Sequence, residues 1–135
     1  MYVLCIVDVQ PGFEESEFIL EPILALLRQA KEEGAFVIVA QFKNCGEYPM
    51  SFDHPYQKVW HTKRDKIQAI RRVLPMEPLN TSIEIRIAGL YTDLFVKDIV
   101  RALSRDYPVK VLSHACYGKE EALDQMRAYK NVTVL

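Results

Sequence analysis

Two kinds of apolar pattern alternate along this chain. Continuous apolar runs are typical of strands buried on both faces, and they occur at residues 2–9, 35–42, 83–88, 109–112 and 132–135. Between the runs, apolar residues recur at helical spacing, which predicts helices over 16–33, 62–74, 92–105 and 118–129. This alternation predicts one α/β domain over residues 1–135, built as a three-layer α/β/α sandwich around a parallel sheet.

The order of the strands follows from the handedness of their connections. Right-handed crossovers leave few topologies, and the order 2-1-3-4-5 is expected for a doubly wound sheet of about five strands. The chain then reverses direction across the sheet between strands one and three, and a ligand crevice is expected at their carboxyl ends. Residues 8–13 and 89–95 follow those two strands.

Candidate chemistry at this crevice begins with a carboxylate. Asp8 closes the first strand, either as a residue that caps the following turn or as a partly desolvated base. Thr92 is expected to cap a helix whose free N–H groups could hold an anion or an oxyanion. Lys63 falls in the first turn of the predicted helix 62–74, where a cation faces the positive end of the helix dipole. It is either a surface residue or is held there for an anion or for Asp8.

Two segments carry a family resemblance. Residues 6–10 read Ile-Val-Asp-Val-Gln, and residues 89–96 read Gly-Leu-Tyr-Thr-Asp-Leu-Phe-Val. They resemble the V-D-x-Q and G-x-x-T-[DN]-x-C-V motifs of the isochorismatase-like cysteine hydrolases, a family that includes nicotinamidases. Residues 113–116 resemble the family's segment after the next strand, so the resemblance spans nearly the whole chain in the same order and spacing.

The resemblance implies roles for individual residues. Asp8 would be the base and Lys63 its electrostatic partner, both close to Phe95. The backbone amides of Tyr91 and residue 95 would form the oxyanion hole, and the family tends to have a cis peptide bond where Leu90 meets Tyr91 here. Thr92 and Phe13 would line the same pocket.

Phe95 departs from the family pattern, because it stands where the family has its nucleophilic cysteine. A phenyl ring has no lone pair, so covalent acyl transfer at this position is impossible. The metal-binding aspartate and histidines of nicotinamidases are also missing from residues 41–45. We interpret His54 and His61 as surface or pocket-rim residues and expect neither a metal nor another cofactor.

Another cysteine could replace the missing nucleophile. Cys116 follows the fourth strand, with His114 two residues earlier, and a Cys/His pair makes a nucleophile where the side chains meet. The competing interpretation is a small, semi-buried apolar residue. Cys5 lies within the first strand and is expected in the core.

The composition excludes some classes of binding partner. The chain has 17 basic and 18 acidic residues, which excludes the broad positive field of a non-specific nucleic-acid binder and argues against a membrane-surface role. Three widely spaced cysteines, no apolar run near 20 residues and no basic leader favour a reducing cytoplasm.

The sequence leaves three functions open. The leading hypothesis is a catalytically impaired or non-catalytic protein that keeps a pocket near Asp8 and Lys63 for a small amide, acid or heteroaromatic ligand. The second is an active hydrolase of a small amide or enol ether, using a water activated by Asp8. The third is a protein-interaction module, and a homo-oligomer is expected. Aromatic residues in the long segment 43–61 either cover a pocket or pack the segment onto the sheet.

Overall fold

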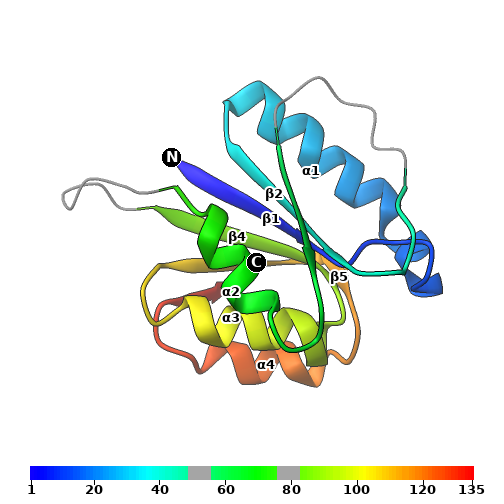
Figure 1. Cartoon of the computed structure of the whole chain (residues 1–135). Helices are drawn as coiled ribbons and strands as arrows, with labels where there is room; N and C mark the ends of the chain where they lie inside the picture. The colour runs from blue at the N-terminus through cyan, green and yellow to red at the C-terminus, as the bar shows by residue number, and fades with distance from the viewer. Residues whose placement is uncertain (49–55, 76–82) are drawn as a thin grey trace.

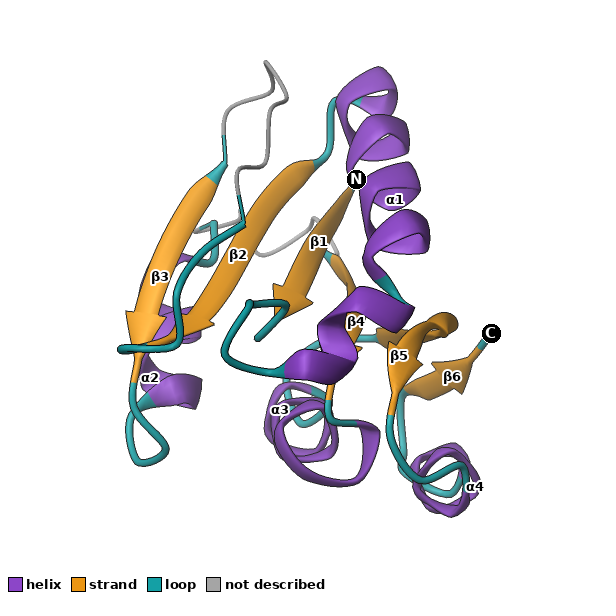
Figure 2. Ribbon diagram, turned by 90° about the vertical axis from the view of Figure 1, so that its right-hand side faces the viewer, coloured by secondary structure: helices purple, strands orange, loops and turns teal. Residues whose placement is uncertain are grey.

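The computed structural model describes residues 1–48, 56–75 and 83–135, and these form a parallel sheet between two layers of helices (Figures 1 and 2). The strands are β1 (Tyr2–Val7), β2 (Phe36–Phe42), β3 (Gln57–His61), β4 (Glu84–Leu90), β5 (Val109–Tyr117) and β6 (Val132–Val134). The helices are α1 (Leu20–Glu33), α2 (Lys66–Val73), α3 (Lys97–Leu103) and α4 (Glu121–Arg127), with short helical segments η1 (Glu14–Phe18) and η2 (Thr92–Val96).

The strand order is β3-β2-β1-β4-β5-β6, and every neighbouring pair is parallel. The five predicted strands are present in the predicted order, so the doubly wound topology is confirmed. The correction is a sixth strand, β3, which lies within the segment 43–61 that the sequence leaves without regular structure. Strand β3 is at the edge of the sheet and buries only Val59 and His61, so it lacks the continuous apolar run that marks the central strands.

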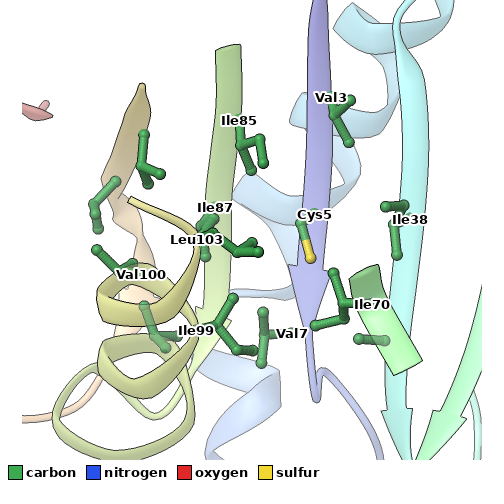
Figure 3. Close-up of a cluster of buried hydrophobic side chains, with 14 of the residues drawn as sticks. Val3, Cys5, Val7, Ile38, Ile70, Ile85, Ile87, Ile99, Val100 and Leu103 are labelled. Carbon is green, nitrogen blue, oxygen red and sulfur yellow. The ribbon is translucent and has the colours of Figure 1, made fainter. Parts of the chain in front are cut away.

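The sheet separates two apolar clusters. Along β1, alternate side chains point to opposite faces: Val3, Cys5 and Val7 join the cluster beneath α2 and α3, while Leu4 and Ile6 join the one beneath α1. Figure 3 shows the first cluster, where β1 and β4 side chains meet those of α3. Burial on both faces explains why the central strands have continuous apolar runs.

Gly89 brings the carboxyl ends of β1 and β4 together. It is opposite Val7 in the parallel register, and it has a φ of 131°. A Cβ atom at this position would lie 2.1 Å from the Val7 carbonyl oxygen, a distance that no side chain tolerates. The crevice at the switch point therefore depends on a residue without a side chain.

The predicted helices begin later than expected. The short segment η1 covers the predicted start at residue 16, and α1 begins only at Leu20; its end at the left-handed Gly34 agrees with the predicted stop. Helix α2 begins at Lys66 rather than Thr62. Segment η2 precedes α3, and Thr92 is not its cap: the capping residue is Tyr91, whose carbonyl accepts N–H groups from Leu94 and Val96 at 3.0 and 3.1 Å. Among the described residues, no helix is both long and apolar enough to cross a bilayer.

Candidate functional site

Asp8 lies at the switch point and faces the α2–α3 side of the sheet. Strict alternation after Val7 would send its side chain to the α1 side, but Asp8 has a left-handed φ of 56°. Its backbone N–H still continues the sheet by donating to Ala40 at 2.9 Å. The carboxylate instead meets His61, which points the same way as Val59 in the α2–α3 cluster. The unusual backbone conformation thus sets the direction of the carboxylate.

Asp8 and His61 form a fully buried pair. The Asp8 Oδ1 and His61 Nε2 atoms are 2.7 Å apart, and both side chains are 0% exposed. The other ring nitrogen, Nδ1, lies 3.1 Å from the Thr62 carbonyl oxygen, so it carries a hydrogen if it is to bond there. Among the described residues, Asp8 Oδ2 has no hydrogen-bond partner. The interpretation of His61 as a rim residue is therefore wrong, and His54 lies outside the described residues.

Burial controls the electrostatics of this pair. Removal from water raises the pKa of Asp8 above its ordinary value of 3.8, while the His61 hydrogen bond, the His61 charge and the more distant Lys66 charge lower it. Desolvation is the largest of these causes. Asp8 therefore holds a proton more readily than an exposed aspartate does.

The lysine whose charge acts on Asp8 is Lys66. The Thr62 N–H and hydroxyl groups donate to Asp65 Oδ1 at 2.6 and 2.9 Å, which closes a turn before α2 instead of forming its first turn. Lys63 lies in that turn and is exposed. The Lys66 side chain is 5% exposed and its Nζ lies 3.2 Å from Asp98 Oδ2. Among the described residues, the side chain in contact with the Asp8 carboxylate is His61, and the predicted partnership of Lys63 with Asp8 is not among their ion pairs.

Aromatic rings cluster next to the His61 side of the Asp8–His61 pair. The centroid of the Phe95 ring lies 6.0 Å from Phe13, 5.8 Å from Phe42 and 6.1 Å from Tyr91, and Lys66 Nζ lies 4.4 Å from the same centroid. The ring of Phe42 also contacts His61, edge to face at 5.4 Å. Three predicted pocket residues, Phe13, Tyr91 and Phe95, are therefore brought together. They form one aromatic cluster, in which each ring is partly exposed.

A cis peptide bond and a side-chain hydrogen bond define the position of Tyr91. The Leu90–Tyr91 peptide bond is cis, as the resemblance implies. The Tyr91 hydroxyl donates to Glu15 Oε2 at 2.8 Å, and burial together with this carboxylate raises the pKa of Tyr91 to about 12. Thr92 is 2% exposed, so it lies within the packed structure and not on an open pocket wall.

Gln10 is a site residue whose role the sequence did not reveal. Its amide Nε2 donates to the Phe42 and Gly46 carbonyls, both at 2.9 Å, and its Oε1 accepts the Phe42 N–H at 2.7 Å. Its backbone N–H donates to Ser16 Oγ at 3.0 Å. These bonds join the segments that follow β1 and β2, and the V-D-x-Q motif was the signal for this residue.

Cys116 and His114 do not form a nucleophilic pair. Cys116 is opposite Gly89 in the register and packs against the α2–α3 cluster, whereas His114 lines a hollow on the α1 side with Leu4 and Leu26. Burial raises the pKa of the Cys116 thiol to about 12. Cys5 is fully buried, as predicted, with its thiol pKa also raised to about 12. Within the described ranges, no three metal-ligating side chains come together.

An open hollow lies where the segment that follows β2 meets β3. It has a volume of about 670 Å³ and is lined by Lys43, Asn44, Gly46, Glu47 and Trp60. Trp60 is 41% exposed, and Lys58 lies over its ring while pairing with Glu47. Tyr48 and Tyr56 instead pack against the α1-side cluster. Aromatic residues of this segment thus take both predicted roles, while Phe52 lies outside the described residues.

Comparisons by sequence find no relative: no protein-family model matches the chain, and no curated protein matches it. Solved structures do match. The pyrazinamidase of Pyrococcus horikoshii in complex with zinc has a TM-score of 0.77 at 17% identity, covering 99% of this chain and 98% of that one. The nicotinamidase of Staphylococcus aureus has a TM-score of 0.75 at 13% identity, covering 98% and 96%.

A third match is an isochorismatase-like hydrolase from Alkaliphilus metalliredigens, with a TM-score of 0.72, 15% identity and coverage of 98% and 94%. These likenesses extend over nearly the full length of both chains in each pair. The chain therefore has the α/β fold of nicotinamidases and isochorismatase-like hydrolases, as its motifs imply.

Proposed function

We propose that this protein is a catalytically impaired member of the isochorismatase-like hydrolases, which binds a small amide, acid or heteroaromatic molecule and forms no covalent acyl-enzyme. The observation that carries the proposal is the Phe95 ring, packed against Phe13, Phe42 and Tyr91. A thiol is missing from the position where the family resemblance puts the nucleophile. A ring occupies the space that a substrate carbonyl would need.

The water-activated alternative has less support. A general base must reach the proton of its water within hydrogen-bond distance, but Asp8 is 0% exposed and its Oδ1 is engaged by His61. The unpartnered Oδ2 atom would become a base only after the aromatic cluster opens. Hydrolysis through Asp8 is therefore an outcome to test and not the proposed activity.

The hollow beside Trp60 supports ligand binding. Sites for small molecules usually combine aromatic surface with a few polar groups in a volume of roughly 300–1,000 Å³, and this hollow of about 670 Å³ has Trp60, Lys43 and Asn44 on its walls. An indole face suits a heteroaromatic ring. A lysine suits the carboxylate of an acid better than the neutral amide.

The catalytic part is tested with Phe95→Cys and its matched control Phe95→Ala. Both variants open the space under the ring, but only the first supplies a thiol. Loss of a nucleophile removes on the order of 10⁴–10⁶-fold in rate. We therefore expect no turnover of nicotinamide or pyrazinamide by the wild type or Phe95→Ala, and a trapped acyl adduct in mass spectra of Phe95→Cys alone.

Two results would contradict the proposed loss of catalysis. Robust wild-type turnover that survives alkylation of Cys45 and Cys116, yet disappears in Asp8→Asn, would overturn the impaired interpretation in favour of water-mediated hydrolysis. Wild-type turnover that alkylation abolishes would point instead to a relocated thiol.

Ligand binding is tested through Trp60, the single tryptophan of the chain. Its fluorescence reports the hollow alone, so titration with nicotinamide and nicotinic acid should change it in a saturable way. We expect Lys43→Gln to weaken binding of the acid and to leave the amide unaffected. An unchanged spectrum at millimolar concentrations of both compounds would contradict a ligand site beside Trp60.

Two expectations remain part of this proposal: a cytoplasmic location and a homo-oligomer. Cell fractionation tests the first, and size-exclusion chromatography with light scattering tests the second. A monomeric mass at micromolar concentration would contradict the expected oligomer.

A further inference from the structure

A third hollow lies at the amino ends of the strands, whereas Asp8 lies at the carboxyl end of β1. It is formed where α3 ends before β5 and where α4 leads into β6, both at the amino ends of strands. Its volume is about 480 Å³, and it is lined by Arg101, Ser104, Arg105, Tyr129, Lys130 and Asn131. This hollow shares no residue with the Asp8 cluster or with the Trp60 hollow.

Hydrogen bonds join its two walls. Asn131 adopts a left-handed φ of 66°, and its Nδ2 donates to the Ser104 carbonyl at 3.2 Å. The Asn131 carbonyl accepts the Val109 N–H at 2.8 Å, which continues the pairing of β5 with β6. Ser104 is 7% exposed, and its hydroxyl donates to the Arg101 carbonyl at 3.3 Å. The position of Lys130 relative to the end of α3 is therefore fixed by the fold.

Three cations share this hollow without an anion between them. Arg101 and Arg105 lie four residues apart on α3 and its end, so they share a helical face, and Lys130 comes from the other wall. Within residues 1–48, 56–75 and 83–135, none of the three lies within ion-pair distance of an acidic side chain.

Two acidic residues of the described chain, Asp106 after α3 and Asp124 on α4, already pair with other arginines. Asp106 accepts Arg71 at 2.8 Å, and Asp124 pairs with Arg127. The arginines and Lys130 thus keep their full charge toward the hollow.

The end of a helix explains only part of this arrangement. The carboxyl end of α3 bears a partial negative charge of roughly half a unit, which attracts cations and accounts for one arginine. Arg105 adds like-charge repulsion at i and i+4, and Lys130 belongs to another element. Three full positive charges exceed that partial charge severalfold, so the hollow attracts anions.

We propose that this hollow binds a small phosphate monoester, with its dianionic group between Arg101, Arg105 and Lys130. Guanidinium groups match phosphate oxygens in bidentate geometry and keep their charge at all physiological pH values. The volume of about 480 Å³ exceeds the needs of a bare phosphate and leaves space for an organic moiety. Tyr129 and Asn131 offer that moiety a ring and polar groups.

Calorimetric titration of the whole protein tests this site. The probes are AMP and ribose 5-phosphate, and their matched neutral controls are adenosine and ribose. We expect both phosphates to bind, the neutral compounds not to bind, and affinity to fall between 50 and 200 mM salt because charges dominate. Arg101→Gln and Arg105→Gln should each weaken binding about 10- to 100-fold, as loss of a charge-assisted hydrogen bond does.

Control variants make the result specific to the hollow. Arg28→Gln removes an exposed cation on α1, on the other face of the sheet, and should leave the affinity unchanged. Arg101→Lys retains the positive charge but loses the bidentate guanidinium group, and it should weaken binding less than Arg101→Gln. Circular dichroism and melting temperature show that each variant folds.

Several outcomes would overturn the proposal. These are no heat of binding at millimolar phosphate ester, equal binding of adenosine and AMP, equal losses in Arg28→Gln and Arg101→Gln, or inorganic sulfate binding as tightly as AMP. Because the hollow is remote from Phe95, Phe95→Cys should bind AMP like the wild type, and the test is independent of the proposed function.

Discussion

The buried Asp8–His61 pair gives a sharp prediction about stability. His61→Phe keeps an aromatic ring against Phe42 but removes the nitrogen that lies 2.7 Å from Asp8 Oδ1. Asp8 Oδ2 has no partner among the described residues, so the variant leaves both oxygens of a 0% exposed carboxylate without a hydrogen bond. The substitution keeps the packing of the ring but also removes the Nδ1 contact with the Thr62 carbonyl, so the Asp8→Asn background is needed to isolate the pair.

The expected loss is large. Leaving a buried carboxylate without its partner costs about 3–5 kcal/mol of unfolding free energy at neutral pH. For a domain of this size, that loss corresponds to a fall in melting temperature of roughly 10–15 °C. In the Asp8→Asn background, no charge is stranded, and the same substitution should cost only about 1 kcal/mol, as one neutral hydrogen bond does. The difference of about 2 kcal/mol or more is the coupling of the pair.

The loss should also depend on pH with a definite sign. Burial raises the pKa of Asp8 above 3.8, so between 3.8 and the folded-state pKa the folded protein binds more protons than the unfolded chain. Stability from this group therefore falls as pH rises through that interval, by at most about 1.4 kcal/mol per pH unit. Without His61, whose hydrogen bond and charge lower the Asp8 pKa, the interval extends to higher pH.

Urea unfolding of the four proteins of this double-mutant cycle, from pH 5 to pH 8, measures both effects. The expected result is that His61→Phe is least destabilised at pH 5, and that Asp8→Asn removes this pH dependence. A loss below about 1 kcal/mol at pH 7, or an equal loss in both backgrounds at all pH values, would refute a buried, coupled pair.

Three further predictions concern the rest of the site. Gly89→Ala should prevent folding or cost more than about 4 kcal/mol of unfolding free energy, because its Cβ would lie 2.1 Å from a backbone oxygen. The control Gly34→Ala, whose Cβ would have nothing within 4 Å, should cost about 1 kcal/mol. Similar urea midpoints for the two variants would contradict this prediction. Gln10→Ala removes three side-chain hydrogen bonds and should cost about 2–4 kcal/mol, and a change below 0.5 kcal/mol in urea unfolding would be inconsistent with that role. Iodoacetamide at pH 8 should modify Cys45 well before Cys116, because the thiolate is the reactive form and the pKa of the Cys116 thiol is raised to about 12. Peptide mass spectrometry that finds Cys116 labelled first would disprove this order.

Local pattern and general handedness were enough to predict five of the six described strands and their order. Central strands are buried on both faces, so each leaves a continuous apolar run in the sequence, and right-handed crossovers then fix the order. The edge strand β3 was missed because one of its faces meets solvent, and only Val59 and His61 are buried. An edge position is a property of the assembled sheet, and no local pattern encodes it.

Some features of the site also followed from the sequence, and others only from the tertiary structure. The sequence alone showed that Asp8 lies at the switch point and that Phe95 supplies no nucleophile, because both statements need only residue identity and strand order. The tertiary structure decided which cation acts on Asp8. A three-residue spacing between Thr62 and Asp65 suits a helix cap and a separate turn alike, and here it closes a turn, so the helix begins at Lys66.

The partner of Asp8 was also beyond the sequence. Strand alternation predicts the wrong face for this side chain, and only its left-handed φ of 56° directs it to His61, which is 53 residues away in the chain. Likewise, the sequence placed a ring at position 95, but the contacts of that ring with Phe13, Phe42 and Tyr91 come from three separate segments. Residue identity set which chemistry is absent at position 95, whereas packing across the sheet decided which rings surround that position, because only packing brings distant side chains to one place.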